Sequence, residues 1–230
     1  MDPLSALARA PLFKGSSPCD FEALRPAIRT QAYGKGQYVW HMGDPATTMY
    51  VLILGQINVS RLGPGGEEFV VDVFLPGDTF GEFSVLDGLP RIVDCVAVEP
   101  AVCLAVERGV LLDFLERNPR LTLKILAGLS RRIRDQDLYR SETAFQNISG
   151  RVALTLITLA DSHGERVADG VRVPAHISQT TLANMVGASR ENVNRALSRL
   201  IKLGHIRRSG AMIIIPKLEE LRAAYSWFGS

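Results

Sequence analysis

The chain has 230 residues, of which 47% are hydrophobic and 22% charged. This composition excludes a largely disordered protein, and the length allows one long domain or two shorter ones. Apolar runs such as residues 49–54 are far shorter than the roughly 20 residues that cross a bilayer, and residues 2–11 do not form a secretory signal. We therefore expect a cytoplasmic protein that makes no membrane contact.

The net charge of +2 is unevenly distributed along the chain. Residues 151–230 contain 11 Lys and Arg against 6 Asp and Glu, a net charge of +5, whereas the remainder contains 15 against 18, a net charge of −3. A basic segment of this kind attracts polyanions. The C-terminal part is therefore the predicted docking site for a polyanionic partner.

The three cysteines, Cys19, Cys95 and Cys103, form no CxxC pair and have no nearby histidine at zinc-ligand spacing. Cys95 and Cys103 fall in β-rich segments, where cysteine commonly packs as a small hydrophobic residue. An iron–sulfur site needs a cysteine cluster, but Cys19 stands alone; His41, the single histidine of the β-rich part, is interpreted as a surface or packing residue. We expect no metal, haem or iron–sulfur cluster.

The segment from residue 33 to residue 106 alternates short β-branched runs with glycine-containing turns. Short, regularly spaced strands of this kind predict an antiparallel sandwich or barrel. The expected strands are residues 37–40, 49–54, 56–62, 67–75, 92–98 and 101–106.

Helical spacing begins after residue 106, and a long helix is expected from Pro119 to about Gln146. Leu126, Leu129 and Ile133 follow one another at the 3,4 spacing of a coiled coil, and the same seam becomes polar beyond them. The spacing favours self-association through this helix; packing against the chain's own sheet is the alternative.

Asn147 can begin the next helix, so residues 145–147 are the predicted hinge. The chain is accordingly divided into an effector-sensing β domain over residues 1–118, a dimerisation helix over residues 119–146 and a DNA-binding domain over residues 147–230.

A helix-turn-helix is predicted in the segment from His176 to Leu200. Ser178 can cap the first helix, Gly187 supplies the tight turn, and Ser189 can cap the second helix. Apolar residues of the second helix share one stripe, which leaves a polar face exposed. Arginine can donate two hydrogen bonds to guanine and glutamate can accept one from cytosine, so this face can read base pairs in the major groove. The predicted DNA-contacting residues are Ser189, Arg190, Glu191, Asn194, Arg195 and Arg199 of the second helix, with Arg208 in a small wing that follows.

A simpler interpretation of the polar face is a solvated helix surface with i,i+4 ion pairs, such as Glu191 with Arg195. The segment GASRENVNRALSRL, residues 187–200, nevertheless closely resembles the recognition segment of the cyclic-AMP receptor protein/FNR superfamily, G-x-S-R-E-T-V-x-R. Asn192 stands where threonine is usual. The resemblance implies that Arg190, Glu191 and Arg195 read base edges at GTGA-like half-sites. It also implies a homodimer on palindromic double-stranded DNA and contact with RNA polymerase.

Residues 80–91, FGEFSVLDGLPR, resemble the phosphate-binding cassette of cyclic-nucleotide domains. Gly81 lets the backbone approach a phosphate, Ser84 lies in a helical turn with free N–H groups, Glu82 can accept a ribose hydroxyl and Arg91 can neutralise the cyclic phosphate. The resemblance implies an α+β fold, in which a cyclic-nucleotide-binding type of antiparallel β-roll precedes a long dimerisation helix and a winged helix-turn-helix. It also implies a small-molecule effector, with cyclic AMP or cyclic GMP as the candidates.

The cassette departs from the family pattern at Ile92, which replaces a hydroxyl side chain, and at Val93, which replaces alanine. Gln136 and Asp137 stand where members that respond to cyclic AMP carry threonine and a small polar residue facing the purine. A different base is therefore open, as is a pocket that keeps a Glu82–Arg91 ion pair without a ligand. The expected effector-binding residues are Gly81, Glu82, Phe83, Ser84, Arg91, Ile92, Gln136 and Asp137.

Two other classes of function remain open. Glu82, Asp87 and Arg91 could line a hydrolytic site, but no nucleophile–base pair, metal triad or P-loop accompanies them, so we expect no enzyme activity. The other alternative is a regulatory protein that binds a nucleotide but not DNA.

Overall fold

The computed structural model describes residues 2–174, 177–210 and 212–226; His176, in the predicted helix-turn-helix segment, lies outside them. The chain divides into two compact units, Met1–Ile133 and Arg134–Ser230. The long helix α4 (Pro119–Ala144) therefore contributes to both units.

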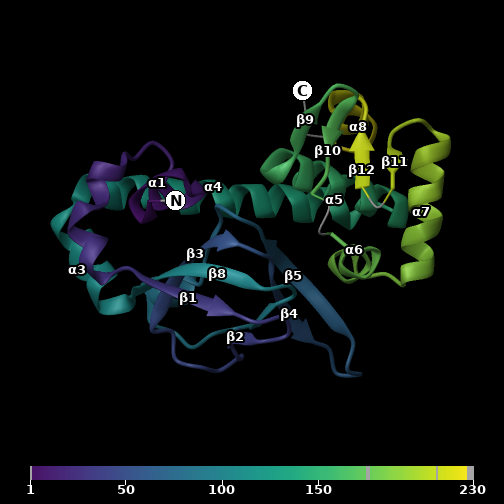
Figure 1. The fold of residues 1–230 in the computed structure, drawn as a ribbon. Helices are drawn as coiled ribbons and strands as arrows, with labels where there is room; N and C mark the ends of the chain where they lie inside the picture. Colours follow the sequence, from purple (N-terminus) through teal and green to yellow (C-terminus); the bar gives the residue numbers. More distant parts are fainter. Residues whose placement is uncertain (1, 175–176, 211, 227–230) are drawn as a thin grey trace. The chain divides into compact units, whose positions relative to one another are not determined.

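The N-terminal unit contains two four-stranded antiparallel sheets (Figure 1). This arrangement confirms the predicted antiparallel β-roll. One sheet has the order β1 (Arg29–Tyr33), β8 (Ala101–Glu107), β3 (Thr48–Leu54), β6 (Thr79–Phe80). The other has the order β2 (Tyr38–Trp40), β7 (Asp94–Ala97), β4 (Ile57–Leu62), β5 (Glu68–Phe74).

A row of aromatic rings forms much of the roll's interior. Ring centroids lie 5.9 Å apart between Trp40 and Tyr50, and 5.2 Å apart both between Tyr50 and Phe80 and between Phe80 and Phe74. Cys95 is completely buried in the same cluster, as the sequence predicted for a packing thiol. Burial raises the pKa of this thiol, which keeps it protonated.

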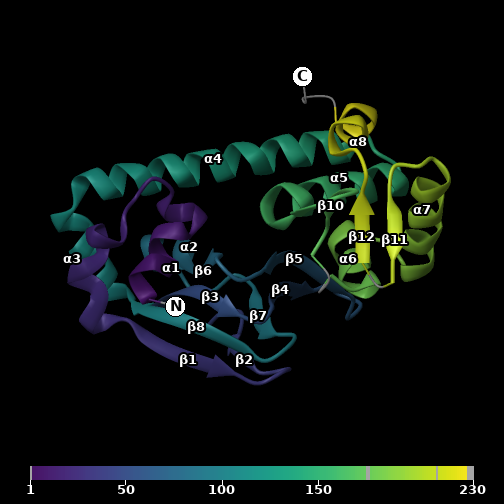
Figure 2. The same ribbon diagram turned by 45° about the horizontal axis from the view of Figure 1, so that its top comes forward.

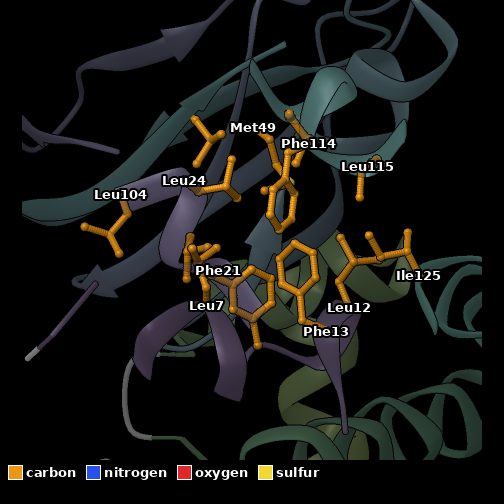
Figure 3. Close-up of a cluster of buried hydrophobic side chains, with 14 of the residues drawn as sticks. Leu7, Leu12, Phe13, Phe21, Leu24, Met49, Leu104, Phe114, Leu115 and Ile125 are labelled. Carbon is orange, nitrogen blue, oxygen red and sulfur yellow. The ribbon is translucent and has the colours of Figure 1, made fainter. Parts of the chain in front are cut away.

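A second core lies on the other side of the β3–β8 sheet and contains the N-terminal helices (Figure 3). Phe13 and Phe21 meet edge to face with their centroids 5.1 Å apart, and Phe21 also contacts Phe114. The sequence patterns had not predicted the helices before β1. The helices around this core are α1 (Pro3–Arg9), η1 (Pro11–Phe13), η2 (Pro18–Ala27) and α3 (Arg108–Arg117).

Helix α4 turns one face to this core. Leu121 and Ile125 are buried in it and Leu129 packs against it, whereas Leu126 and Ile133 are 53% and 56% exposed. The predicted seam of Leu126, Leu129 and Ile133 is therefore divided, because Leu129 belongs to the chain's own core. The exposed seam is instead made by Leu123, Leu126 and Ile133.

In its described residues, the C-terminal unit packs four helices, α5 to α8, against a four-stranded antiparallel sheet, with α7 beside the β11–β12 hairpin (Figure 2). The hairpin pairs Arg207 with Ile214 and Ser209 with Met212, as predicted for a wing. Its helices are α5 (Ile148–His163), α6 (Gln179–Val186), α7 (Arg190–Lys202) and α8 (Leu218–Tyr225); its strands are β9 (Glu165–Val167), β10 (Gly170–Arg172), β11 (Arg207–Ser209) and β12 (Met212–Ile215).

The three predicted helix caps of this unit are confirmed. The side chains of Asn147, Ser178 and Ser189 accept hydrogen bonds from backbone amides three residues later, at 3.1, 3.0 and 3.3 Å. Gly187 has a φ of 64° and ends α6 in the left-handed conformation that glycine adopts most easily.

Among the described residues, no helix combines the length and the apolar character needed to span a bilayer.

Candidate DNA interface and effector pocket

Helix α7 has one buried and one polar face. Val193, Ala196, Leu197 and Leu200 are at most 4% exposed and belong to the core of the C-terminal unit, as predicted. Their burial fixes the rotation of the helix about its axis. Arg190, Glu191, Arg195 and Arg199 are consequently exposed, and Asn194 is half-buried at the edge of the polar face.

The first turn of α7 is preorganised by its cap. Ser189 accepts a hydrogen bond from the Asn192 amide, and the Asn192 side chain accepts one from Arg195. Hydrogen bonds from the backbone amide of Glu191 and from the Ser189 hydroxyl lower the pKa of the Glu191 carboxyl. Glu191 is thus an anionic acceptor near two arginines at the N-terminal end of the helix.

The wing contributes two further arginines. Arg207 forms an ion pair with Asp169 at 3.2 Å and donates to the Asp169 carbonyl at 3.1 Å. Arg208 is exposed on the same strand, so its guanidinium can reach an external phosphate.

The cassette begins at Gly81, whose φ of 80° lies in the left-handed region. A Cβ at this position would lie 2.8 Å from Nη1 of Arg91 and 3.2 Å from the Trp40 ring, so a larger residue could not fit without displacing one of them. Helix α2 (Glu82–Asp87) follows directly. Glycine is therefore required here for both backbone conformation and space.

Glu82 is 1% exposed and forms its ion pair with Arg132 of α4, at 2.6 Å from Nη1. The second guanidinium nitrogen of Arg132 lies 3.0 Å from Oδ2 of Asp72 on β5. The guanidinium carbon of Arg132 lies 4.9 Å from the ring centroid of Phe83. One arginine thus connects α4 to the cassette and to the adjacent sheet.

Burial raises the pKa of Glu82, and the positive charge of Arg132 opposes this rise. The interpretation of the Glu82 partner as Arg91 is wrong. Arg91 instead donates to the backbone carbonyls of Gly81, at 2.8 Å, and of Thr48.

Arg91 is 5% exposed and lies 4.0 Å above the Trp40 ring. Its Nε is buried without a hydrogen-bond partner, and desolvation lowers the pKa of the guanidinium. Arg91 therefore retains one donor without a partner, on the side chain predicted to neutralise a phosphate.

The remaining cassette residues differ in exposure. Ser84 is buried, with its hydroxyl 3.5 Å from the Pro90 carbonyl, whereas Phe83 and Ile92 are 41% and 67% exposed. Gln136 and Asp137 are exposed and belong to the C-terminal unit; Asp137 lies 3.7 Å from Arg140. Their place beside an effector stays a prediction.

The sequence patterns did not identify Arg132, Asp72 or Trp40 as members of this site. Arg132 is one of several arginines on α4, and its spacing from Glu82 in the sequence carries no periodic signal. The one available indication was that Arg132 lies four residues before Gln136, so that the two side chains share a face of the helix.

Comparison with known proteins identifies the two domains that contain these residues. The profile of the cyclic nucleotide-binding domain matches residues 30–118, and that of the Crp-like helix-turn-helix domain matches residues 150–224. The "CRP-like cAMP-activated global transcriptional regulator" of Mycobacterium tuberculosis is 31% identical over 215 residues, which cover 94% of this chain and 96% of the relative. The chain belongs to the cyclic-AMP receptor protein/FNR superfamily of transcription regulators.

A further relative and a solved structure are also similar to this chain. The "Cyclic AMP receptor protein" of Thermus thermophilus is 31% identical over 198 residues, which cover 86% of this chain and 88% of the relative. The solved structure of FixK2 from Bradyrhizobium japonicum has the same fold, with a TM-score of 0.76 and 21% identity; the match covers 88% of this chain and 99% of the FixK2 chain. As a member of this superfamily, the chain is a transcription regulator with a cyclic nucleotide-binding domain and a DNA-binding helix-turn-helix.

Proposed function

We propose that the protein binds a palindromic DNA site as a homodimer, with the first turn of α7 in the major groove of each half-site. The observation that carries this proposal is the exposed cluster of Arg190, Glu191 and Arg195 opposite a fully buried stripe. Asn194 and Arg199 extend the cluster along the helix, and Ser189 caps it. Arg208 contacts phosphate from the wing, where it adds affinity without sequence information.

The dimer forms through α4. Leu123, Leu126 and Ile133 are between 53% and 67% exposed and recur at coiled-coil spacing on one helix face. An exposed apolar stripe on a 26-residue helix is stabilised by a second copy of the same helix. Contact with RNA polymerase follows from the function of the family.

The test of DNA reading compares two arginines. Arg190→Ala is expected to cost about 1–3 kcal/mol at the cognate site and to relax the preference at one guanine. Arg208→Ala should weaken cognate and random DNA equally and reduce the salt dependence. Footprinting should show two half-sites about 34–36 Å apart. Equal losses on both DNAs for Arg190→Ala, or a single half-site, would contradict the proposal.

The effector we propose is a cyclic nucleotide, cyclic AMP or cyclic GMP, held by Gly81, Glu82, Ser84 and Arg91. Support comes from the unpartnered Nε of Arg91, whose guanidinium lies beside Gly81, and from the name of the Mycobacterium tuberculosis relative, which describes that protein as cAMP-activated. Phe83 and Ile92 border this position, and Gln136 and Asp137 are proposed to meet the base.

A specific observation also favours an effector-independent regulator. Glu82 is already neutralised by Arg132, and two nitrogens of Arg91 are already bonded to carbonyls, so the charged groups are largely paired without a ligand. Thermal shift with cyclic AMP, cyclic GMP and cyclic di-GMP separates the two. A ligand at 100 times its Kd adds about 2.7 kcal/mol to the free energy of unfolding. No shift with any of the three would favour effector independence.

The proposed regulator carries out no catalytic step and holds no metal. Among the described residues, no three His, Cys, Asp or Glu side chains are grouped to hold a metal ion. Turnover of a cyclic nucleotide by the purified protein would overturn the non-enzymatic assignment. The place of action is the cytoplasm, where the DNA and the polymerase are found.

A further inference from the structure

We propose that Tyr225 and Ser226, at the end of α8, brace the linker of residues 145–147 and thereby fix the last turns of α4 to the DNA-binding domain. The brace consists of two hydrogen bonds. Gln146 in the linker donates from Nε2 to the Tyr225 carbonyl at 3.0 Å, and the Ser226 hydroxyl donates to Glu142 of α4. Glu142 is 9% exposed, so its bond to Ser226 is shielded from solvent.

The far end of the brace is held by α5. Leu221 of α8 is completely buried, and Arg222 donates to Asp161 of α5 at 2.7 Å. The Tyr225 ring also meets His205 with centroids 5.6 Å apart. Because α8 is anchored in this way, its terminal residues can restrain the linker.

The Gln146 side chain occupies the space that a side chain at position 150 would fill. A Cβ on Gly150 would lie 2.0 Å from Oε1 and 2.9 Å from Cβ of Gln146. The first turn of α5 is therefore shaped so that Gln146 can reach across it to α8.

A third contact joins α4 and α5 directly. The Tyr139 hydroxyl lies 2.9 Å from that of Thr155, which is 2% exposed. Residues of α4 from Arg134 onward belong to the same compact unit as α5–α8, and these contacts explain why. With these contacts in place, the linker of residues 145–147 does not act as a free hinge between α4 and α5.

The consequence for DNA binding rests on the proposed function. If α4 forms the dimer axis, the brace fixes the distance between the two α7 helices and thereby selects the half-site spacing. Gln146 and Ser226 are then positioning residues that never touch DNA.

The experiment uses the full chain and three variants. Gln146→Ala with Ser226→Ala removes both brace bonds, Gly150→Ala displaces Gln146 while favouring helix, and Lys217→Ala breaks an exposed ion pair of α8 as a matched control. Hydrogen exchange of the Gln146 amide, which donates to the Thr143 carbonyl, is measured without DNA. We expect about a tenfold increase in both brace variants, as lost hydrogen bonds predict, and no change in the control.

The second measurement is affinity for palindromes whose half-site spacing is native, one base pair shorter or one longer. The preference for the native spacing should fall several-fold in the brace variants and stay unchanged in the Lys217→Ala control. Unchanged exchange overturns the brace, and unchanged spacing preference in DNA-binding protein overturns its positioning role. Failure of the wild-type protein to bind DNA as a dimer would instead refute the proposed function. The exchange measurement, which is made without DNA, would still test the brace.

Discussion

Replacing Arg132 by methionine is the most direct test of the network that connects α4 to the cassette. Methionine keeps much of the apolar stem but removes the charge that faces Glu82 at 2.6 Å and Asp72 at 3.0 Å. Glu82 is 1% exposed, so its carboxylate would be left buried without its counter-ion.

The expected loss of stability follows from the unequal exposure of the two ion pairs that Arg132 forms, with Glu82 and with Asp72. Removing one partner of a buried pair costs about 3–5 kcal/mol, whereas an exposed pair contributes about 0–1 kcal/mol. The Asp72 side chain is 42% exposed, so its ion pair with Arg132 adds little. Arg132 is itself 29% exposed, which favours the lower end of the range of about 3–5 kcal/mol. We expect Arg132→Met to lower the free energy of unfolding by about 3 kcal/mol at neutral pH.

The loss depends on pH with a defined sign. Burial raises the pKa of Glu82, and removing Arg132 raises it further because the opposing charge is gone. A carboxyl whose pKa is higher in the folded than in the unfolded state destabilises the fold as pH rises from the unfolded towards the folded value. The difference in the free energy of unfolding between the wild type and Arg132→Met should therefore become smaller as the pH is lowered from 8 to 5.

Urea unfolding followed by tryptophan fluorescence measures these differences. Arg140→Met is the matched control, because Arg140 lies on the same helix in an exposed ion pair 3.7 Å long. It should change the free energy of unfolding by less than about 0.5 kcal/mol. Adding Glu82→Gln to Arg132→Met should recover part of the loss. A loss no larger than that of the control, or one independent of pH, would refute the reasoning.

Three further outcomes are expected. Phe80→Ala should cost about 3–5 kcal/mol in urea unfolding, because Phe80 is completely buried among stacked rings; a cost below about 1 kcal/mol would contradict the packing. Ser189→Ala should lower the stability of the C-terminal unit by about 1 kcal/mol, since it removes the cap of α7, while Ser198→Ala, on the exposed face, should have little effect; equal calorimetric Tm values would argue against the cap. Replacing Gln136 by Leu and Asp137 by Ala should leave dimerisation intact or stronger in analytical ultracentrifugation and change the effector dependence of DNA affinity; an unchanged dependence would make these residues structural.

The sequence was most informative where structure is local. The caps of α6 and α7 depend on a serine and the amide three residues later, and the buried stripe of α7 depends on helical periodicity. Such contacts lie within one or two helical turns, so the order of residues specifies them. The wing hairpin is local as well, whereas the β-roll and the cassette at Gly81 were predicted from the spacing of short strands together with the family resemblance.

The partners of the pocket residues were decided by tertiary structure. Glu82 and Arg132 are 50 residues apart, and Arg91 reaches the Thr48 carbonyl across 43 residues. No periodicity relates positions so distant, because the fold alone brings their elements together. The division of the α4 seam has a related cause: spacing specifies which side chains share a face, but whether Leu129 meets a second helix or its own core depends on where the N-terminal helices pack.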